Sequence, residues 1–432
     1  MQLQDPEVAS QSMLSVTNAR TAPRWGLPGW AMLVAVFGPG LVVMLADTDV
    51  GSIITAGQSG VQWGYKLLLP QFILMPVLYI VQELTVRIGI FTGKGHGELI
   101  REAFGPGWAW FSAAGLAVAT IGALLTEFSG VAGVGDLFGI PHYVSLPLAA
   151  AALLAIVVTG SYRRVERIAI VVGLFELAFF FVAWAAHPDA GLMASESLHP
   201  PVLNAGYEYL VAANIGAVIM PWMVFYQQSA MADKRLRAEH FHAARWDTGI
   251  GAVVTQLVMA AVLIAAAASI RPHAPQASLS TVGQMSLALT PYLGAEFGKV
   301  VFAFGVLGAG LVAAIVASLA LAWGLGEVAG YRRSLEYHPL KAKWFYGVYA
   351  FCVVGGAVAV GLVPNLISLN VGVQVMNALL LPVVLGFLVR LAMVTLPESH
   401  KLKGWYKWVV IVVCAITCAF GVLGGVGGLF LG

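Results

Sequence analysis

Charged residues are scarce in this sequence of 432 residues: only 10% are Asp, Glu, Lys or Arg, whereas 59% are hydrophobic. So few polar side chains cannot cover the surface of a water-soluble protein of this size. The net charge is +2, and no basic patch with interleaved aromatic residues indicates nucleic-acid binding. The composition therefore predicts a protein that lies in the lipid bilayer and has no nucleic-acid partner.

Cysteine is also rare. Cys352, Cys414 and Cys418 lie in apolar stretches and match no metal-binding or redox spacing, so we expect no disulfide framework. The sequence contains no phosphate-binding loop, metalloprotease motif or recognisable pair of nucleophile and base. We therefore expect neither an enzyme nor a bound cofactor.

The sequence consists mainly of long apolar blocks. Each block is long enough to cross a hydrocarbon core about 30 Å thick as a helix. The pattern predicts an all-α membrane protein with about eleven transmembrane helices. The blocks lie near 29–60, 66–90, 107–135, 143–160, 164–186, 205–232, 246–269, 292–324, 343–362, 366–391 and 405–430. Residues 1–28 are polar and are expected to form a cytosolic tail, not a cleaved signal peptide.

The distribution of Lys and Arg predicts the orientation, because cytoplasmic loops collect positive charge. With the N-terminus inside, twenty of the 23 Lys and Arg residues fall on the cytoplasmic side, and only Lys66, Arg271 and Lys299 fall outside. We therefore expect a cytoplasmic N-terminus and an external C-terminus. Separately, we expect the membrane to be a bacterial inner membrane.

Two carboxylates lie near the middle of the predicted helix 29–60, at Asp47 and Asp49. Charged groups at this depth are costly and mark functional sites, and two neighbouring anions repel unless a cation or a proton lies between them. In the predicted helix 205–232, Pro221 lacks an amide donor and frees the carbonyl of Ala217 one turn earlier. The two interruptions sit five helices apart, as expected for two inverted repeats with a binding site between them.

The predicted organisation follows from this symmetry. Residues 29–186 form the first five-helix repeat, residues 205–391 form the second, and the helix at 405–430 lies outside both. Other polar groups inside the spans, Glu83, Glu127 and Glu176, are candidates for pairing between helices, and Glu127 is equally a candidate for a functional role. Gln374 and Asn377 are three residues apart and share one helix face.

Three stretches of sequence carry a resemblance to a known family. They are Gly38-Pro39-Gly40-Leu41 followed by Asp49-Val50-Gly51-Ser52; Arg87-Ile88-Gly89-Ile90-Phe91-Thr92-Gly93; and Ala217-Val218-Ile219-Met220-Pro221, with Tyr162-Arg163-Arg164-Val165-Glu166 as a less specific match. At these residues the chain resembles the Nramp family of divalent metal transporters, from about Gly38 to Arg390. The resemblance implies a LeuT-like 5+5 inverted repeat with interrupted helices 1 and 6.

The resemblance also implies a metal site. Carried over to this chain, its ligands are Asp49, Ser52, the carbonyl of Ala217 and the sulfur of Met220. Gln374 is a possible further ligand, and Asp47 adds a second carboxylate that resembles the magnesium-transporting branch of the family.

The chain departs from the family at several of these positions. Val50 and Ser52 replace a proline and an asparagine, Trp222 and Met223 replace a histidine and an asparagine, and Leu124 replaces an acidic residue. A hydroxyl in place of an amide predicts a wider pocket. The groups usually found on the proton route are mostly missing.

These features leave three hypotheses for the transported species. The first is Mg²⁺, Mn²⁺ or both, carried by alternating access with weak proton coupling or none, because Mg²⁺ prefers oxygen ligands. The second is proton-coupled uptake of Mn²⁺ or Fe²⁺, which the thioether of Met220 favours. The third is a small organic cation held by Asp49 and by the aromatic residues that follow the second interruption, Trp222, Phe225 and Tyr226. We expect a monomer in each case.

Overall fold

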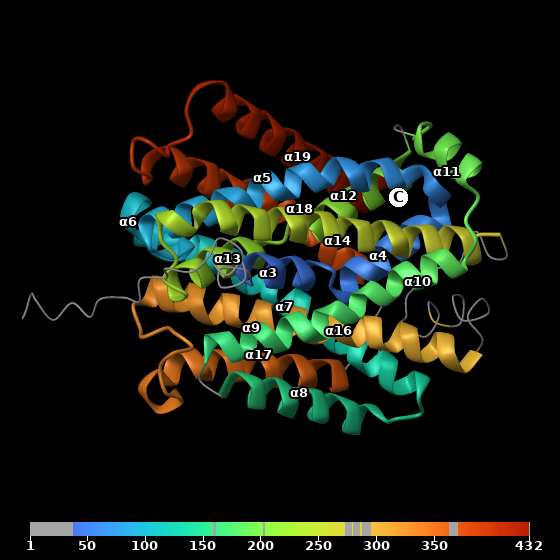
Figure 1. The fold of residues 1–432 in the computed structure, drawn as a ribbon, viewed down its shortest axis with the longest axis horizontal. Coiled ribbons are helices and arrows are strands. Elements are labelled where there is room, and N and C mark those ends of the chain that lie inside the picture. Colours follow the sequence, from blue (N-terminus) through green and yellow to red (C-terminus); the bar gives the residue numbers. More distant parts are fainter. Residues whose placement is uncertain are drawn as a thin grey trace, which may run out of the picture.

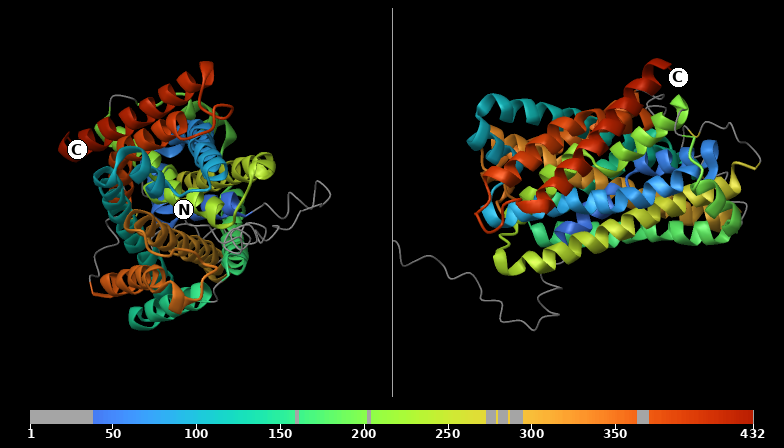
Figure 2. Two further views of the ribbon diagram at one scale, coloured as in Figure 1. Left: turned by 90° about the vertical axis from the view of Figure 1, so that its left-hand side faces the viewer. Right: turned by 90° about the horizontal axis from the view of Figure 1, so that it is seen from above.

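The computed structural model describes residues 38–158, 161–201, 204–272, 279, 286, 295–362 and 370–431. The predicted tail 1–28 and the start of the first predicted helix lie outside these residues. The described residues are helical throughout apart from their turns, which confirms the all-α prediction. Most helices run along one common direction and form a bundle (Figures 1 and 2).

The helices follow the predicted apolar blocks closely. In chain order they are α3 (Pro39–Asp47), α4 (Val50–Trp63), η1 (Gly64–Leu67), α5 (Leu68–Thr92), α6 (His96–Phe104), α7 (Pro106–Leu137), α8 (His142–Val158), α9 (Tyr162–Gly173), η2 (Leu174–Leu177), α10 (Ala178–Ala185), α11 (Ala190–Ser197), α12 (Ala205–Val218), α13 (Pro221–Asp233), η3 (Ala238–His240), α14 (Phe241–Ser269), α16 (Ala295–Ala329), η5 (Pro339–Lys341), α17 (Lys343–Leu362), α18 (Asn370–Val394) and α19 (Gly404–Leu431).

Nine helical stretches within the described residues are long and apolar enough to cross a membrane, and α8 is a shorter apolar helix. One of the nine, Val50–Thr92, has 43 residues and reverses direction at η1, so that α4 and α5 run in opposite directions (Figure 1). This stretch therefore supplies two crossings. Counted in this way, the described helices agree with the predicted eleven spans.

Glycines terminate the helices where the chain must turn. Gly93 adopts a left-handed conformation with φ 65° and ends α5, while Gly105, with φ 94°, separates α6 from Pro106 at the start of α7. Residues with a Cβ atom adopt these angles rarely. The short helix α6 therefore lies as a separate element at one end of the bundle (Figure 1).

The two interrupted spans lie in the centre of the bundle. In the most apolar 18 residues of Ala205–Asp233, 89% of the residues are buried, compared with 33% in the same length of Tyr162–Ala185 and of Gly404–Gly428. Helix α3 packs against α14 and α16, and α4 packs against α14, α12 and α18. This position shields the backbone groups freed at the interruptions from lipid, as irregular structure at membrane depth requires.

Candidate functional site

The first transmembrane span is interrupted, as predicted. Helix α3 ends at Asp47, and α4 begins at Val50, with Thr48 and Asp49 between them. Asp49 has an extended conformation (φ −70°, ψ 170°), and its Oδ1 accepts a hydrogen bond of 2.6 Å from the backbone N–H of Ser52. Asp49 therefore caps the start of α4, which stabilises the break.

The sixth span is interrupted at the corresponding place. Helix α12 ends at Val218, Ile219 and Met220 are extended, and α13 starts with Pro221. The residue that would donate to the Ala217 carbonyl in a continuous helix is Pro221, which has no N–H. The Ala217 carbonyl instead accepts a hydrogen bond of 3.0 Å from the hydroxyl of Ser52. This hydrogen bond joins the two interruptions.

Gln374 and Asn377 on α18 add two amide side chains to the polar groups at the interruptions. The Nε2 of Gln374 donates to Oδ1 of Asp49 over 3.4 Å, and the Nδ2 of Asn377 donates to Oε1 of Gln374 over 2.9 Å. The structure thus brings Gln374 to Asp49, but with its amide nitrogen directed at the carboxylate. Its oxygen would reach a cation only after the amide rotates away from Asn377.

Among the residues that the structure describes, several carboxylate oxygens at the first interruption have no hydrogen-bond partner. They are both oxygens of Asp47 and Oδ2 of Asp49, although these side chains are 1% and 0% exposed. An ionised carboxylate without a partner is costly in an apolar interior. These oxygens are therefore suited to a cation.

The remaining donors would have to come from outside the acidic side chains. In the part of the chain that the structure describes, no group of three or more His, Cys, Asp or Glu side chains is arranged to hold a metal ion. A cation at Asp49 would need a mixed set of ligands, with carboxylate, hydroxyl, backbone carbonyl and thioether groups. Met220, which is fully buried beside the second interruption, supplies the thioether.

Glu127 contributes to the first interruption more directly than the sequence indicated. Its Oε2 accepts the backbone N–H of Val50 over 3.1 Å, and its Oε1 accepts the hydroxyl of Thr126 over 2.9 Å. Glu127 on α7 thereby satisfies an amide at the start of α4 that has no partner within the helix. Its position inside an apolar span was the available signal, but the sequence did not reveal the contact.

Asp247 on α14 was not singled out from the sequence. Its carboxylate accepts backbone N–H groups at the start of α3, from Gly38 over 3.2 Å, Gly40 over 2.8 Å and Leu41 over 3.2 Å. An acidic residue near the end of an apolar span was the only signal for it. This side chain holds the N-terminal end of α3 in place and thus sets the direction in which α3 runs to Asp47.

The other acidic candidates differ in role. Glu83 forms ion pairs with Arg87 over 2.7 Å and with Arg245 over 3.4 Å, so it is a structural residue. Glu176 lies on η2, fully buried and next to Thr48 in the first interruption. It therefore places a third acidic side chain close to Asp47 and Asp49.

The aromatic residues of the organic-cation hypothesis are occupied by other contacts. Phe225 lies edge-on to His96 with ring centroids 4.8 Å apart, and Tyr226 packs on Trp323 with centroids 5.5 Å apart. Trp222 is fully buried. The structure therefore does not favour an aromatic cage for an organic cation.

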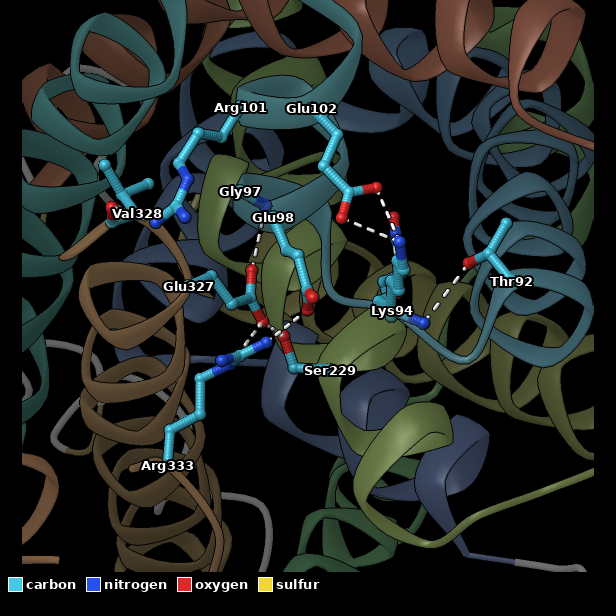
Figure 3. A network of polar contacts seen from close by, with 11 residues as sticks. Thr92, Lys94, Gly97, Glu98, Arg101, Glu102, Ser229, Glu327, Val328 and Arg333 are labelled. Atoms are coloured by element: carbon cyan, nitrogen blue, oxygen red, sulfur yellow. Dashed lines mark hydrogen bonds and ion pairs between the residues drawn. The ribbon is translucent and has the colours of Figure 1, made fainter. Parts of the chain in front are cut away.

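A polar network links α6, α13 and α16 (Figure 3). Glu327 on α16 accepts the hydroxyl of Ser229 on α13 over 2.6 Å and the backbone N–H of Gly97 on α6 over 2.8 Å. Arg333 pairs with Glu98 and lies 3.9 Å from Glu327. These contacts join α13 and α6 to α16.

Two interrupted helices that meet at buried polar groups in the middle of a helical bundle define a membrane transporter with a LeuT-like fold. Solved structures agree with this class. Over 94% of this chain, the structure of MhsT in complex with L-phenylalanine superposes with a TM-score of 0.62 at 13% identity, with 99% of that chain covered. A variant of the Eremococcus coleocola manganese transporter covers 96% of this chain and 92% of its own, with a TM-score of 0.77 at 19% identity.

The sequence comparisons give the family. The profile of the Nramp family, described as natural resistance-associated macrophage protein-like, matches residues 40–426. The chain therefore belongs to the Nramp family, whose members are transporters and not enzymes. A protein named divalent metal cation transporter MntH, from Klebsiella pneumoniae, is 24% identical over 418 residues, which cover 92% of this chain and 95% of that protein.

Proposed function

We propose that this protein carries divalent metal cations across the membrane by alternating access, through a site between the two interrupted spans. The observation that carries the proposal is the contact of Ser52 with the freed carbonyl of Ala217, next to oxygens of Asp47 and Asp49 that have no hydrogen-bond partner in the described part of the chain. Its MntH relatives are named as divalent metal cation transporters, which agrees with a site for such an ion.

In this proposal the ion binds to Asp49, Ser52, the Ala217 carbonyl and Met220. The ion replaces the hydrogen bond between Ser52 and Ala217, because both oxygens then turn their lone pairs to the metal. Asp47 adds negative charge and a second carboxylate. Gln374 joins as a ligand only if its amide rotates, and otherwise orients Asp49.

We propose Mg²⁺ and Mn²⁺ as the transported ions. Hard oxygen donors, namely the two carboxylates, a hydroxyl and a carbonyl, outnumber the single thioether in this set, and Mg²⁺ prefers oxygen and retains water. The thioether of Met220 is the reason to include Mn²⁺ among the substrates, since a softer ligand favours transition metals. The short side chain of Ser52 leaves room for water on the ion.

We further propose that transport is weakly coupled to protons or not coupled. Trp222, Met223 and Leu124 stand where the family pattern has a histidine, an asparagine and an acidic residue, and all three are buried apolar side chains. None of them can carry a proton. Among the acidic residues near Asp49, Glu127 is held by Val50 and Thr126.

For the movement, we propose that spans one, two, six and seven move as a group against the other helices. These are α3 with α4, α5, α12 with α13, and α14. The proposal includes the two repeats, at 29–186 and 205–391, and the extra helix at 405–430. It also places a monomeric protein in a bacterial inner membrane, with its N-terminus in the cytoplasm. The network around Glu327 would then be one of the contacts that break as the site opens.

Purified protein in proteoliposomes tests the function. Entry of Mg²⁺ and of Mn²⁺ is measured with a metal-sensitive dye, while a second dye reports the internal pH. We expect both metals to enter without acidification of the lumen. Acidification in proportion to metal entry would refute weak coupling, and entry of Mn²⁺ alone would refute the magnesium assignment.

A further inference from the structure

A groove on the outer surface lies between α5 and α14, which run side by side along the bundle (Figures 1 and 2). Its volume is about 620 Å³, which is within the range of roughly 300–1,000 Å³ for small-molecule sites. Its wall is largely apolar and includes Met75, Pro76, Tyr79, Trp246, Ile250 and Val253. Trp246, Ile250 and Val253 are exposed, so the groove is open to the surrounding medium.

The length of the groove matches one leaflet of a bilayer. Along α14 it extends from His242 to Val254, and at about 1.5 Å per residue these residues span roughly 18 Å. Half of a hydrocarbon core of about 30 Å is close to this length. A single acyl chain from one leaflet can therefore lie along the groove.

One end of the groove carries positive charge. Arg245 lines it with a side chain that is 41% exposed, and its Nε donates to the hydroxyl of Tyr79 over 3.3 Å. Arg245 shares the carboxylate of Glu83 with Arg87, so two cations face one anion. The cluster retains a net positive charge, with His242 beside it.

Aromatic residues accompany this charge. Trp246 and Tyr79 line the groove next to Arg245. Tryptophan and tyrosine gather where lipid headgroups meet the hydrocarbon core, and arginine extends its charged group to the same level. The charged end of the groove therefore has the composition of a headgroup region.

We propose that this groove binds an anionic phospholipid, with one acyl chain between α5 and α14 and the phosphate at Arg245 and His242. Basic pockets between transmembrane helices hold acidic lipid headgroups in this way. The site is separate from the metal site at Asp49 and goes beyond the proposed transport. Because α5 and α14 belong to spans two and seven, a lipid bound here contacts the group of helices proposed to move.

Native mass spectrometry of the purified protein, titrated with phosphatidylglycerol and with phosphatidylcholine of identical acyl chains, tests the proposal. One basic residue near the headgroup level contributes about fivefold in affinity. We expect the wild type to prefer phosphatidylglycerol by at least this factor, Arg245→Gln to lose the preference, and Arg245→Lys to keep it. Lys407→Gln, which changes a basic residue outside the groove, should leave the preference unchanged.

A second variant tests the acyl-chain position without touching the charge. A Cβ added at Gly249 would meet the ring of Tyr79 at 3.4 Å, a van der Waals distance, and Gly249 lines the groove, so Gly249→Leu is chosen to add apolar bulk there. We expect it to weaken binding of both lipids several-fold. Equal lipid preference in Arg245→Gln and wild type, or unchanged binding in Gly249→Leu, would overturn the proposal, whatever the result of the metal transport assay.

Discussion

Replacing Asp49 by asparagine isolates the effect of its charge on metal binding. Asparagine caps a helix start about as well as aspartate, so the Asp49→Asn side chain can still accept the N–H of Ser52. Removing one partner of a buried charge pair costs about 3–5 kcal/mol. This corresponds to a loss of metal affinity of roughly 100- to 4,000-fold.

The alanine variant separates charge from capping. Asp49→Ala loses both, and the missing cap lowers the free energy of unfolding by about 1 kcal/mol. We therefore expect both variants to lose metal affinity alike, but only Asp49→Ala to lose stability. Calorimetric titration with Mn²⁺ measures the affinity, and thermal unfolding of the same samples measures the stability.

Asp247 provides the matched control, since it is another buried aspartate that accepts N–H groups at the start of a helix. Asp247→Asn should lower the stability by weakening the start of α3 while keeping the affinity for Mn²⁺ within about threefold, because its carboxylate is not a proposed ligand. The reasoning fails if Asp49→Asn binds Mn²⁺ within about threefold of wild type.

Four further changes test other parts of the structure. Met220→Ala should weaken Mn²⁺ binding at least tenfold more than Mg²⁺ binding, and an equal loss for both ions in calorimetry would exclude the thioether as a ligand. Ser52→Asn, which restores the amide of the family pattern, should raise the ratio of Mn²⁺ to Mg²⁺ uptake in proteoliposomes; an unchanged ratio would show that this residue does not set selectivity. Arg333→Gln should increase hydrogen exchange at the start of α6, because the Glu327 network then loses its cation; protection equal to wild type would contradict a closing role. Burial lowers the pKa of His96 from 6.5 to about 4. On acidification His96 is therefore protonated in the unfolded protein before it is protonated in the folded protein, so the free energy of unfolding should fall as the pH drops from 6.5 towards 4, by about 2 kcal/mol at pH 5. A His96→Gln variant with the same pH dependence of unfolding as wild type would refute this.

Much of the fold could be predicted from local sequence. The spans follow from apolar blocks of sufficient length, because a helix is the economical way to satisfy backbone groups in lipid. The break in the sixth span follows from Pro221, which cannot donate to Ala217. The prediction that Asp47 and Asp49 mark a functional site follows from the cost of a carboxylate at that depth.

The contacts that make the site were decided by the tertiary structure. Ser52 and Ala217 are 165 residues apart, and Val50 and Glu127 are 77 apart. No local pattern specifies which side chain satisfies a freed carbonyl or amide, because the choice depends on how distant helices cross. For the same reason the family resemblance could name Gln374 as a possible further ligand but not its orientation, in which the amide oxygen accepts from Asn377 and the nitrogen donates to Asp49. Apolar length and proline chemistry act within one helix and can be read from the sequence, while these pairings arise only once the helices have packed.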